Sequence, residues 1–262
     1  MLAKLLKYEF KATARWFIPI YAALILFALI SRVLLHNDPF VLKEASSFLQ
    51  IAVFLSMFIY VFLFIGIMVV TLVVMIQRFY KSLLGDEGYL MFTLPVQTWK
   101  HLVNKLLIAI LWNLLSAAIG MVSIMLLVPA QELKELGSLL MYIKEYLGTM
   151  GYFSIPLLFL ASIVFSIVQM YTAIALGHLF RKHKLLASFG MYIGINTVSQ
   201  IVFILIILFF QYYLTSLSGP VPSLHPSHIN MLILVTGIIL AVLTAVCFIV
   251  TNIILKRRLN LE

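Results

Sequence analysis

The residues that could do chemistry in this chain are few, and inside its apolar stretches they are uncharged. No Asp or Glu lies in the centre of any long apolar stretch, and a buried carboxylate is what ion-coupled carriers commonly use. The sequence also lacks the G-x-x-x-x-G-K-[ST], H-E-x-x-H and G-x-S-x-G motifs. We therefore expect no catalytic residue and no nucleotide, cofactor or metal site in this chain.

Histidine and cysteine are placed in ways that do not favour metal binding. The six histidines lie in loops or near the ends of apolar stretches. His225 and His228 are close enough to share a metal ion, but no acidic residue accompanies them. Cys247 is the only cysteine, so the chain can form neither an internal disulfide nor a cysteine-based metal site.

Four amides inside the apolar stretches are candidates for lining a translocation path: Asn113, Gln169, Asn196 and Gln200. Asn196 and Gln200 are four residues apart and share one helix face. The alternative is that these amides form hydrogen bonds between helices, typically worth about 0.6 to 2 kcal/mol each. Two pairs of small residues, Ala173 with Gly177 and Gly190 with Gly194, predict close helix packing, within one chain or across a dimer.

The elements that must position these residues are transmembrane helices. The 262-residue chain is 64% hydrophobic and 10% charged, with a mean hydropathy of +1.13, far from the composition of a soluble domain. A transmembrane helix needs roughly 20 apolar residues. Six stretches qualify: about 17–35, 48–76, 104–128, 152–177, 186–214 and 230–255. We therefore predict an all-α integral membrane protein, with residues 1–262 forming a single transmembrane domain.

The basic residues predict the orientation of these helices. Of the 18 Lys and Arg residues, 14 fall in the N-terminal segment, the second loop, the fourth loop and the C-terminal tail. Cytoplasmic loops carry the excess of positive charge. We therefore expect a multi-pass protein of the cell membrane with both termini in the cytoplasm, and we interpret the net charge of +9 as a topology signal that does not indicate nucleic acid binding.

Two segments outside the predicted spans have amphipathic patterns. In residues 1–16 the basic residues Lys4, Lys7, Lys11 and Arg15 share one helix face, which predicts an interfacial helix on anionic lipid; the alternative is an extension of the first span. Glu9 lies on the apolar face and needs a partner in the helix bundle. In the extracellular segment 129–151, leucines and Ile143 recur at helical spacing, whereas Ser216–His228, with three prolines, predicts an irregular loop.

The predicted cytoplasmic loop 78–105, RFYKSLLGDEGYLMFTLPVQTWKHLVNK, contains the most informative pattern. Gly85 can end the preceding helix, and Asp86 can cap a short new one that Pro95 ends. Thr98 can cap the next span. Tyr89, Leu90, Met91, Phe92 and Leu94, between Asp86 and Pro95, form an apolar cluster on the cytoplasmic side. An apolar cluster beside water indicates a binding partner.

This loop, together with six spans and a basic N-terminal helix, resembles the permease subunits of type 2 ABC transporters. The resemblance implies that residues 86–94 form a coupling helix that docks on a separate ATPase subunit. The alternative is an ordinary capped loop with no partner. The positions it would assign to that contact are Asp86, Glu87, Gly88, Tyr89, Leu90, Phe92 and Leu94. The short loop with Arg181, Lys182 and Lys184 could be a second contact with the ATPase or with anionic lipid, or only a positive-inside charge cluster.

The resemblance implies a non-enzymatic permease subunit that pairs with a second, identical or related permease and with ATPase subunits. ATP and magnesium would be bound by the ATPase. The wide apolar surface fits export of an amphipathic cargo, such as a peptide antibiotic or a lipid. The alternatives are a secondary transporter, which would need a buried ionisable group, and a non-transporting membrane scaffold or sensor.

Overall fold

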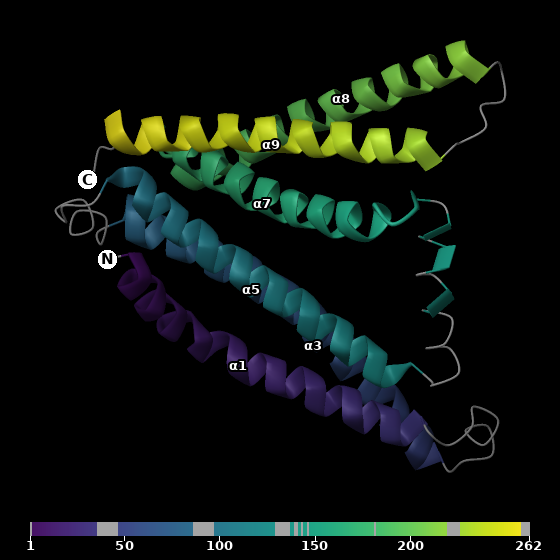
Figure 1. The fold of residues 1–262 in the computed structure, drawn as a ribbon. Helices are drawn as coiled ribbons and strands as arrows, with labels where there is room; N and C mark the ends of the chain where they lie inside the picture. Colours follow the sequence, from purple (N-terminus) through teal and green to yellow (C-terminus); the bar gives the residue numbers. More distant parts are fainter. Residues whose placement is uncertain are drawn as a thin grey trace. The chain divides into compact units, whose positions relative to one another are not determined.

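The computed structural model describes residues 2–35, 47–85, 97–128, 137–138, 141–142, 144–145, 147–180, 182–218 and 226–257. Within these ranges the secondary structure is helical, with no strand. The long elements are α1 (Leu2–Leu35), α3 (Ser47–Phe79), the π-helical turn η1 (Tyr80–Leu84), α5 (Thr98–Leu127), α7 (Gly151–Gly177), α8 (Lys184–Ser218) and α9 (Pro226–Arg257) (Figure 1). The described positions of 137–147 are helical too, as the pattern of the outer segment predicts.

Among the described residues, six helices are long and apolar enough to cross a membrane, which agrees with the predicted number of spans. The shortest candidate span, Gly151–Gly177, has 27 residues, above the roughly 20 that the hydrocarbon core requires. The prediction that Ser216–His228 is an irregular loop is wrong at both ends, because α8 continues to Ser218 and α9 begins at Pro226. Proline is tolerated in the first turn of a helix, where its missing N–H has no partner to lose.

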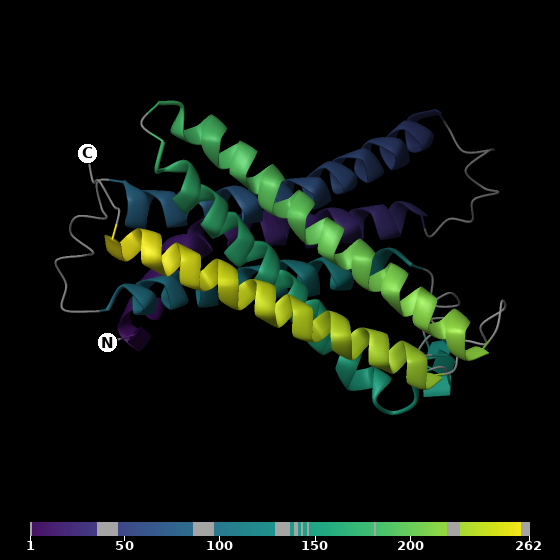
Figure 2. The same ribbon diagram turned by 90° about the horizontal axis from the view of Figure 1, so that it is seen from above.

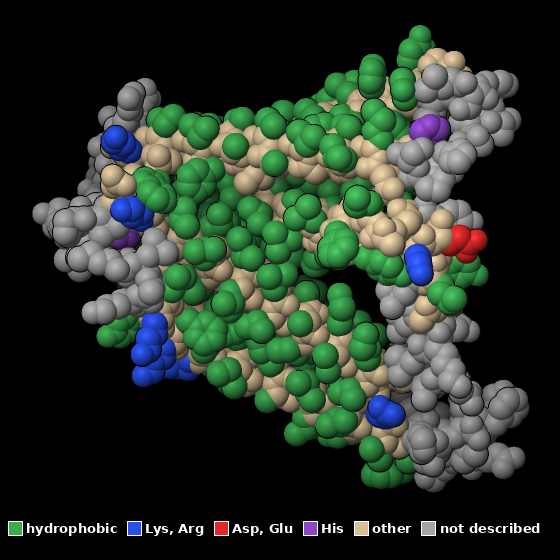
Figure 3. All heavy atoms as spheres, viewed as in Figure 1, with side chains coloured by type: hydrophobic (Ala, Val, Ile, Leu, Met, Phe, Trp, Pro, Cys, Tyr) green, Lys and Arg blue, Asp and Glu red, His purple; other side chains and the backbone are tan. Residues whose placement is uncertain are grey.

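The chain divides into two compact units, which we describe separately. Unit 1 comprises Met1–Gln77 and Leu107–Gly137, and unit 2 comprises Arg78–Leu106 and Ser138–Glu262. Both α3 and α5 therefore contribute residues to each unit. In both units apolar side chains cover the helices, whereas the described Lys and Arg side chains gather near helix ends (Figure 3). A surface of this kind is suited to lipid acyl chains, and we conclude that the protein is embedded in a membrane.

Unit 1 is held together by one ridge of α1 and by hydroxyl pairs. The ridge residues recur at intervals of three or four and are buried: Ala14, Phe17, Tyr21, Leu24 and Ala28. The Tyr21 hydroxyl lies 2.7 Å from Ser116 Oγ, which in turn lies 3.0 Å from Thr71 Oγ1, so one serine of α5 joins α1 to α3. A second pair, Tyr60 with Ser123 at 3.1 Å, joins α3 to α5. Such bonds satisfy polar groups that acyl chains cannot.

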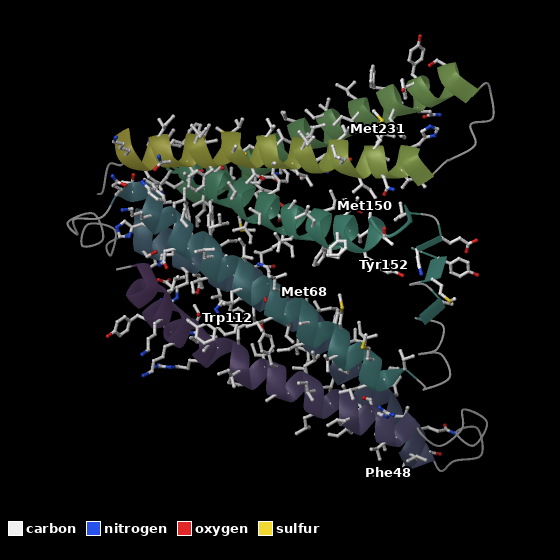
Figure 4. The ribbon with its side chains drawn as sticks, in the orientation of Figure 1. Phe48, Met68, Trp112, Met150, Tyr152 and Met231 are labelled. Atoms are coloured by element: carbon white, nitrogen blue, oxygen red, sulfur yellow. The ribbon has the colours of Figure 1, made fainter. Side chains whose placement is uncertain are left out.

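The N-terminal segment is one helix with the first span, because α1 runs without interruption from Leu2 to Leu35 through Pro19. Trp112 of α5 lies against this segment (Figure 4), stacked on Phe10 at 5.0 Å and on Phe17 at 4.2 Å between ring centroids. Its Nε1–H donates to Thr13 Oγ1 at 2.7 Å. Glu9, expected to face the bundle, is buried. The N-terminal segment is therefore fixed to α5 through one tryptophan.

In unit 2, α7 packs against both α8 and α9 (Figure 2). Its apolar core contains Phe165, Val168, Leu240 and Cys247. Thr172 Oγ1 lies 3.0 Å from Thr251 Oγ1 and donates to the Cys247 carbonyl at 3.1 Å. Polar side chains thus join α7 to α9 beside an apolar core.

Small residues have different roles at the two predicted positions in unit 2. A Cβ on Gly177 would collide with the backbone and hydroxyl of Ser188 on α8, so the predicted close packing is confirmed there. A Cβ on Gly190 or Gly194 would meet no described atom within 4 Å. Among the described residues, Gly177 therefore allows α7 and α8 to pack closely, whereas Gly190 and Gly194 take part in no such close contact.

Candidate functional site

The residues assigned to ATPase coupling, Asp86 to Leu94, lie outside the described residues, as does Arg181 of the second contact. Of the other residues of that contact, Lys182 is exposed and Lys184 is half-buried. The structure does describe both flanks of the coupling segment: η1 with Gly85 on one side, and the start of α5 on the other. The described ends of the predicted loop 78–105 are therefore helical, and both flanks belong to unit 2.

The first flank ends in a π-helical turn. The Gly85 N–H donates to the Tyr80 carbonyl at 2.9 Å, which closes the wider ring of this turn, and Ser82 Oγ donates to the Arg78 carbonyl. Gly85 has extended backbone angles, φ −98° and ψ −167°, so the helix stops at the glycine, as predicted. The π-turn itself was not predicted. Single π-turns are rare and occur frequently at functional sites.

Aromatic contacts fasten this flank to α7. Phe79 stacks on Tyr171 with 4.1 Å between centroids and 9° between ring planes, and the Tyr80 ring meets His178 edge-on at 5.5 Å. Leu83 and Leu84 of η1 are also buried. An aromatic pair contributes about 0.5 to 1.5 kcal/mol beyond the area that it buries. The end of α3 is therefore held against the end of α7.

His178 links the π-turn to the turn between α7 and α8. Its imidazole is hydrogen-bonded to the Leu84 backbone carbonyl. Burial lowers the pKa of His178 below its ordinary value of 6.5, the positive charge of Lys184 lowers that pKa further, and the bond to Leu84 raises it. The imidazole is consequently neutral at pH 7, and it uses an N–H to bind the last carbonyl of η1.

The pKa shift of His178 predicts how its contribution to stability changes with pH. Because the pKa is lower in the folded than in the unfolded protein, stability due to the neutral imidazole is present above pH 6.5 and is lost as the pH falls through the folded-state pKa. We expect the unfolding temperature of wild type to exceed that of His178→Gln more at pH 7.5 than at pH 5.5, in thermal melts of the purified protein. A difference that grows as the pH falls would contradict the assignment.

The second flank is fastened to α9 and α7. Thr98, expected to cap α5, is its first helical residue, and Thr98 Oγ1 donates to Asn252 Oδ1 of α9 at 3.1 Å. The Tyr171 hydroxyl of α7 donates to the Lys105 carbonyl at 3.5 Å, at the long end of the range. Tyr171 thus contacts both flanks, because its ring also stacks on Phe79.

Sequence reasoning missed a buried polar face at the start of α5. His101, Asn104 and Lys105 are only 2%, 2% and 4% exposed, although Lys105 resembles an ordinary cytoplasmic lysine in the sequence. The signal was their spacing, since residues three and four apart share a helix face. On α7, Gln169 is also buried, and its Nε2 has no hydrogen-bond partner among the described residues.

The candidate path residues are divided between the two units. Asn113 belongs to unit 1, where its amide donates to the Ala109 carbonyl at 2.9 Å and lies 3.3 Å from Met75 Sδ. Gln169, Asn196 and Gln200 belong to unit 2. Asn196 is half-buried and Gln200 exposed. For Asn113 the interhelical alternative has direct support, because its amide reaches α3; a path role stays a prediction for all four.

Comparison of the chain with models of known protein families, with curated protein sequences and with solved structures found no match.

Proposed function

We propose that this protein is the permease subunit of an ATP-driven ABC exporter. It would act with a second copy or a related permease and with ATPase subunits that bind ATP and magnesium. The six apolar helices and the bias of basic residues to one set of loops support a cell-membrane location with both termini in the cytoplasm. This chain would contribute the translocation path and the contact with the ATPase, and the ATPase would hydrolyse ATP.

The observation that carries this proposal is that both flanks of the coupling segment contact Tyr171 of α7, and that the second flank also contacts α9. On one side Phe79 stacks on Tyr171 and His178 binds the Leu84 carbonyl. On the other side Thr98 binds Asn252. A force applied to residues 86–94 would reach α7 and α9 through these contacts, because a stacked ring and a satisfied hydrogen bond resist displacement. A contact segment of a transporter needs such attachment, whereas an ordinary loop does not.

The N-terminal segment of α1 would lie at the cytoplasmic membrane surface. The exposure of Lys7, Lys11 and Arg15 supports this placement, because these side chains can extend to the headgroup region. We further propose an amphipathic, peptide-like or lipid-like cargo. Support for this cargo is the uncharged character of the polar residues at the centres of the spans, since amides and hydroxyls can contact a cargo without binding a small ion tightly.

The experiment that tests the proposal is purification of the tagged protein in mild detergent, with identification of co-purifying subunits and an ATPase assay. We expect a P-loop subunit to co-purify, and Glu87→Ala or Tyr89→Ala to leave membrane insertion intact while abolishing stimulated ATP turnover. Tyr142→Ala, on the outer segment and 56% exposed, is the matched control and should retain turnover. Equal turnover in Tyr89→Ala and wild type would exclude the coupling role, and absence of an ATPase would favour the carrier or scaffold.

A further inference from the structure

The exposed side of the N-terminal half of α1 carries three cations in one row. Lys7, Lys11 and Arg15 are all exposed, and their spacing of four residues places them on successive turns of one face. Two large aromatic side chains flank the row: Tyr8 is 74% and Trp16 63% exposed. This combination of Lys and Arg with Tyr and Trp is typical of a membrane–water boundary.

The opposite face of the same segment fixes the direction in which the cations point. Thr13 accepts a hydrogen bond from Trp112, and Phe17 stacks on that indole. Phe17 is 1% and Thr13 1% exposed. A rotation of α1 that turned the cations inward would break these contacts with α5. The contacts of Thr13 and Phe17 with Trp112 therefore keep the three cations on the exposed face of α1.

We propose that this row, with Tyr8 and Trp16, is a binding site for the phosphate groups of anionic phospholipids. Eight residues of α-helix separate Lys7 from Arg15, a rise of about 12 Å, whereas one headgroup layer is about 5 to 8 Å thick. Along the helix axis the three cations therefore extend over more than the thickness of one layer, and the long stems of Lys and Arg let their charged groups reach toward phosphate. The site does not depend on the proposed transport function.

The neighbouring side chains favour a lipid over a soluble acidic protein as the occupant. Trp16 follows Arg15 directly, and Ile18 is 62% exposed one turn beyond the cation. A lipid offers a phosphate beside an acyl chain, so the same molecule can contact the cation and the apolar side chains. Negative charge near a basic cluster adds to the affinity, and the gain falls as salt increases.

The test uses fluorescence quenching by bromine-labelled lipids in vesicles of reconstituted full-length protein. The host lipid is phosphatidylcholine, and the quencher is bromine-labelled phosphatidylglycerol or bromine-labelled phosphatidylcholine at equal mole fraction. The contribution of Trp16 is the difference between wild type and Trp16→Phe. We expect phosphatidylglycerol to quench this contribution with a preference on the order of fivefold at low salt, and the preference to fall in molar salt.

Variants separate this site from the overall charge of the protein. Lys7→Gln/Lys11→Gln/Arg15→Gln should abolish the preference, whereas Arg32→Gln/Lys182→Gln/Lys256→Gln removes the same charge from other exposed positions and should retain it. Lys7→Arg/Lys11→Arg keeps the charge and should keep the preference. If the first variant fails to insert into the membrane, the salt dependence of the lipid preference of the wild-type protein tests the proposal instead. Equal quenching by the two lipids at low salt, or a preference insensitive to salt, would overturn the proposal.

Discussion

Replacing Gly177 by alanine is expected to destabilise the protein by about 3 kcal/mol or more and to lower its unfolding temperature by several degrees. The added methyl group would collide with Ser188 Cα, N and Oγ. Two of these atoms are backbone, so no side-chain rotation can make room, and the ends of α7 and α8 would have to separate. Thermal unfolding of the purified protein in detergent measures the effect.

Two variants control for the effect of adding a methyl group at residue 177. Gly190→Ala adds the same group on α8 where no described atom lies within 4 Å, so we expect a neutral effect or a gain of up to about 1 kcal/mol from better helix propensity. Gly177→Ala/Ser188→Gly should not recover stability, because the colliding backbone atoms remain. Equal melting temperatures for Gly177→Ala and Gly190→Ala would show that α7 and α8 do not approach as described.

The second large effect is expected at Trp112, where truncation to alanine should cost about 3 to 5 kcal/mol. The indole is 3% exposed and lies between Phe10 and Phe17, with its N–H on Thr13. Alanine would remove both stacked contacts and leave a cavity between α1 and α5. Unfolding in denaturant, followed by the fluorescence of the remaining tryptophans, measures the loss.

A graded series identifies which part of the indole matters. Trp112→Phe keeps a stacking ring and loses the hydrogen bond, so its cost should be nearer to about 1 kcal/mol. Trp99→Ala truncates an indole that is 43% exposed and should cost less than about 1 kcal/mol. If Trp112→Ala were no worse than Trp99→Ala, the attachment of the N-terminal segment to α5 would be refuted.

The sequence predicted the spans better than the contacts between them, and lipid explains why. In a soluble helix the apolar face is the buried face, but acyl chains are as apolar as a protein core. Composition therefore cannot distinguish Gly177, which contacts α8, from Gly190, where an added Cβ would meet no described atom within 4 Å. For the same reason, the hydrophobic pattern of the sequence could not show that Trp112 packs between Phe10 and Phe17 of α1.

The end of the helix at Gly85 could be predicted because glycine has a low intrinsic helix propensity. The π-turn before it could not, since its geometry depends on Phe79 and Tyr80 meeting Tyr171 and His178 from a distant part of the chain. Lys105 is a similar case. Its burial is set by the tertiary structure, whereas its charge in the sequence predicts only that the residue lies near the cytoplasmic side of the membrane.

The π-turn η1 also makes the number of residues in this short stretch important, independent of their identity. In an α-helix each residue turns the chain by about 100° and advances it by about 1.5 Å. In η1 the Gly85 N–H instead bonds a carbonyl five residues earlier, so the closed turn holds one residue more than an α-helical turn does. Deleting one residue from Tyr80–Leu84 would replace this wide turn by an ordinary helical one, so the length of the stretch matters separately from the identity of its side chains.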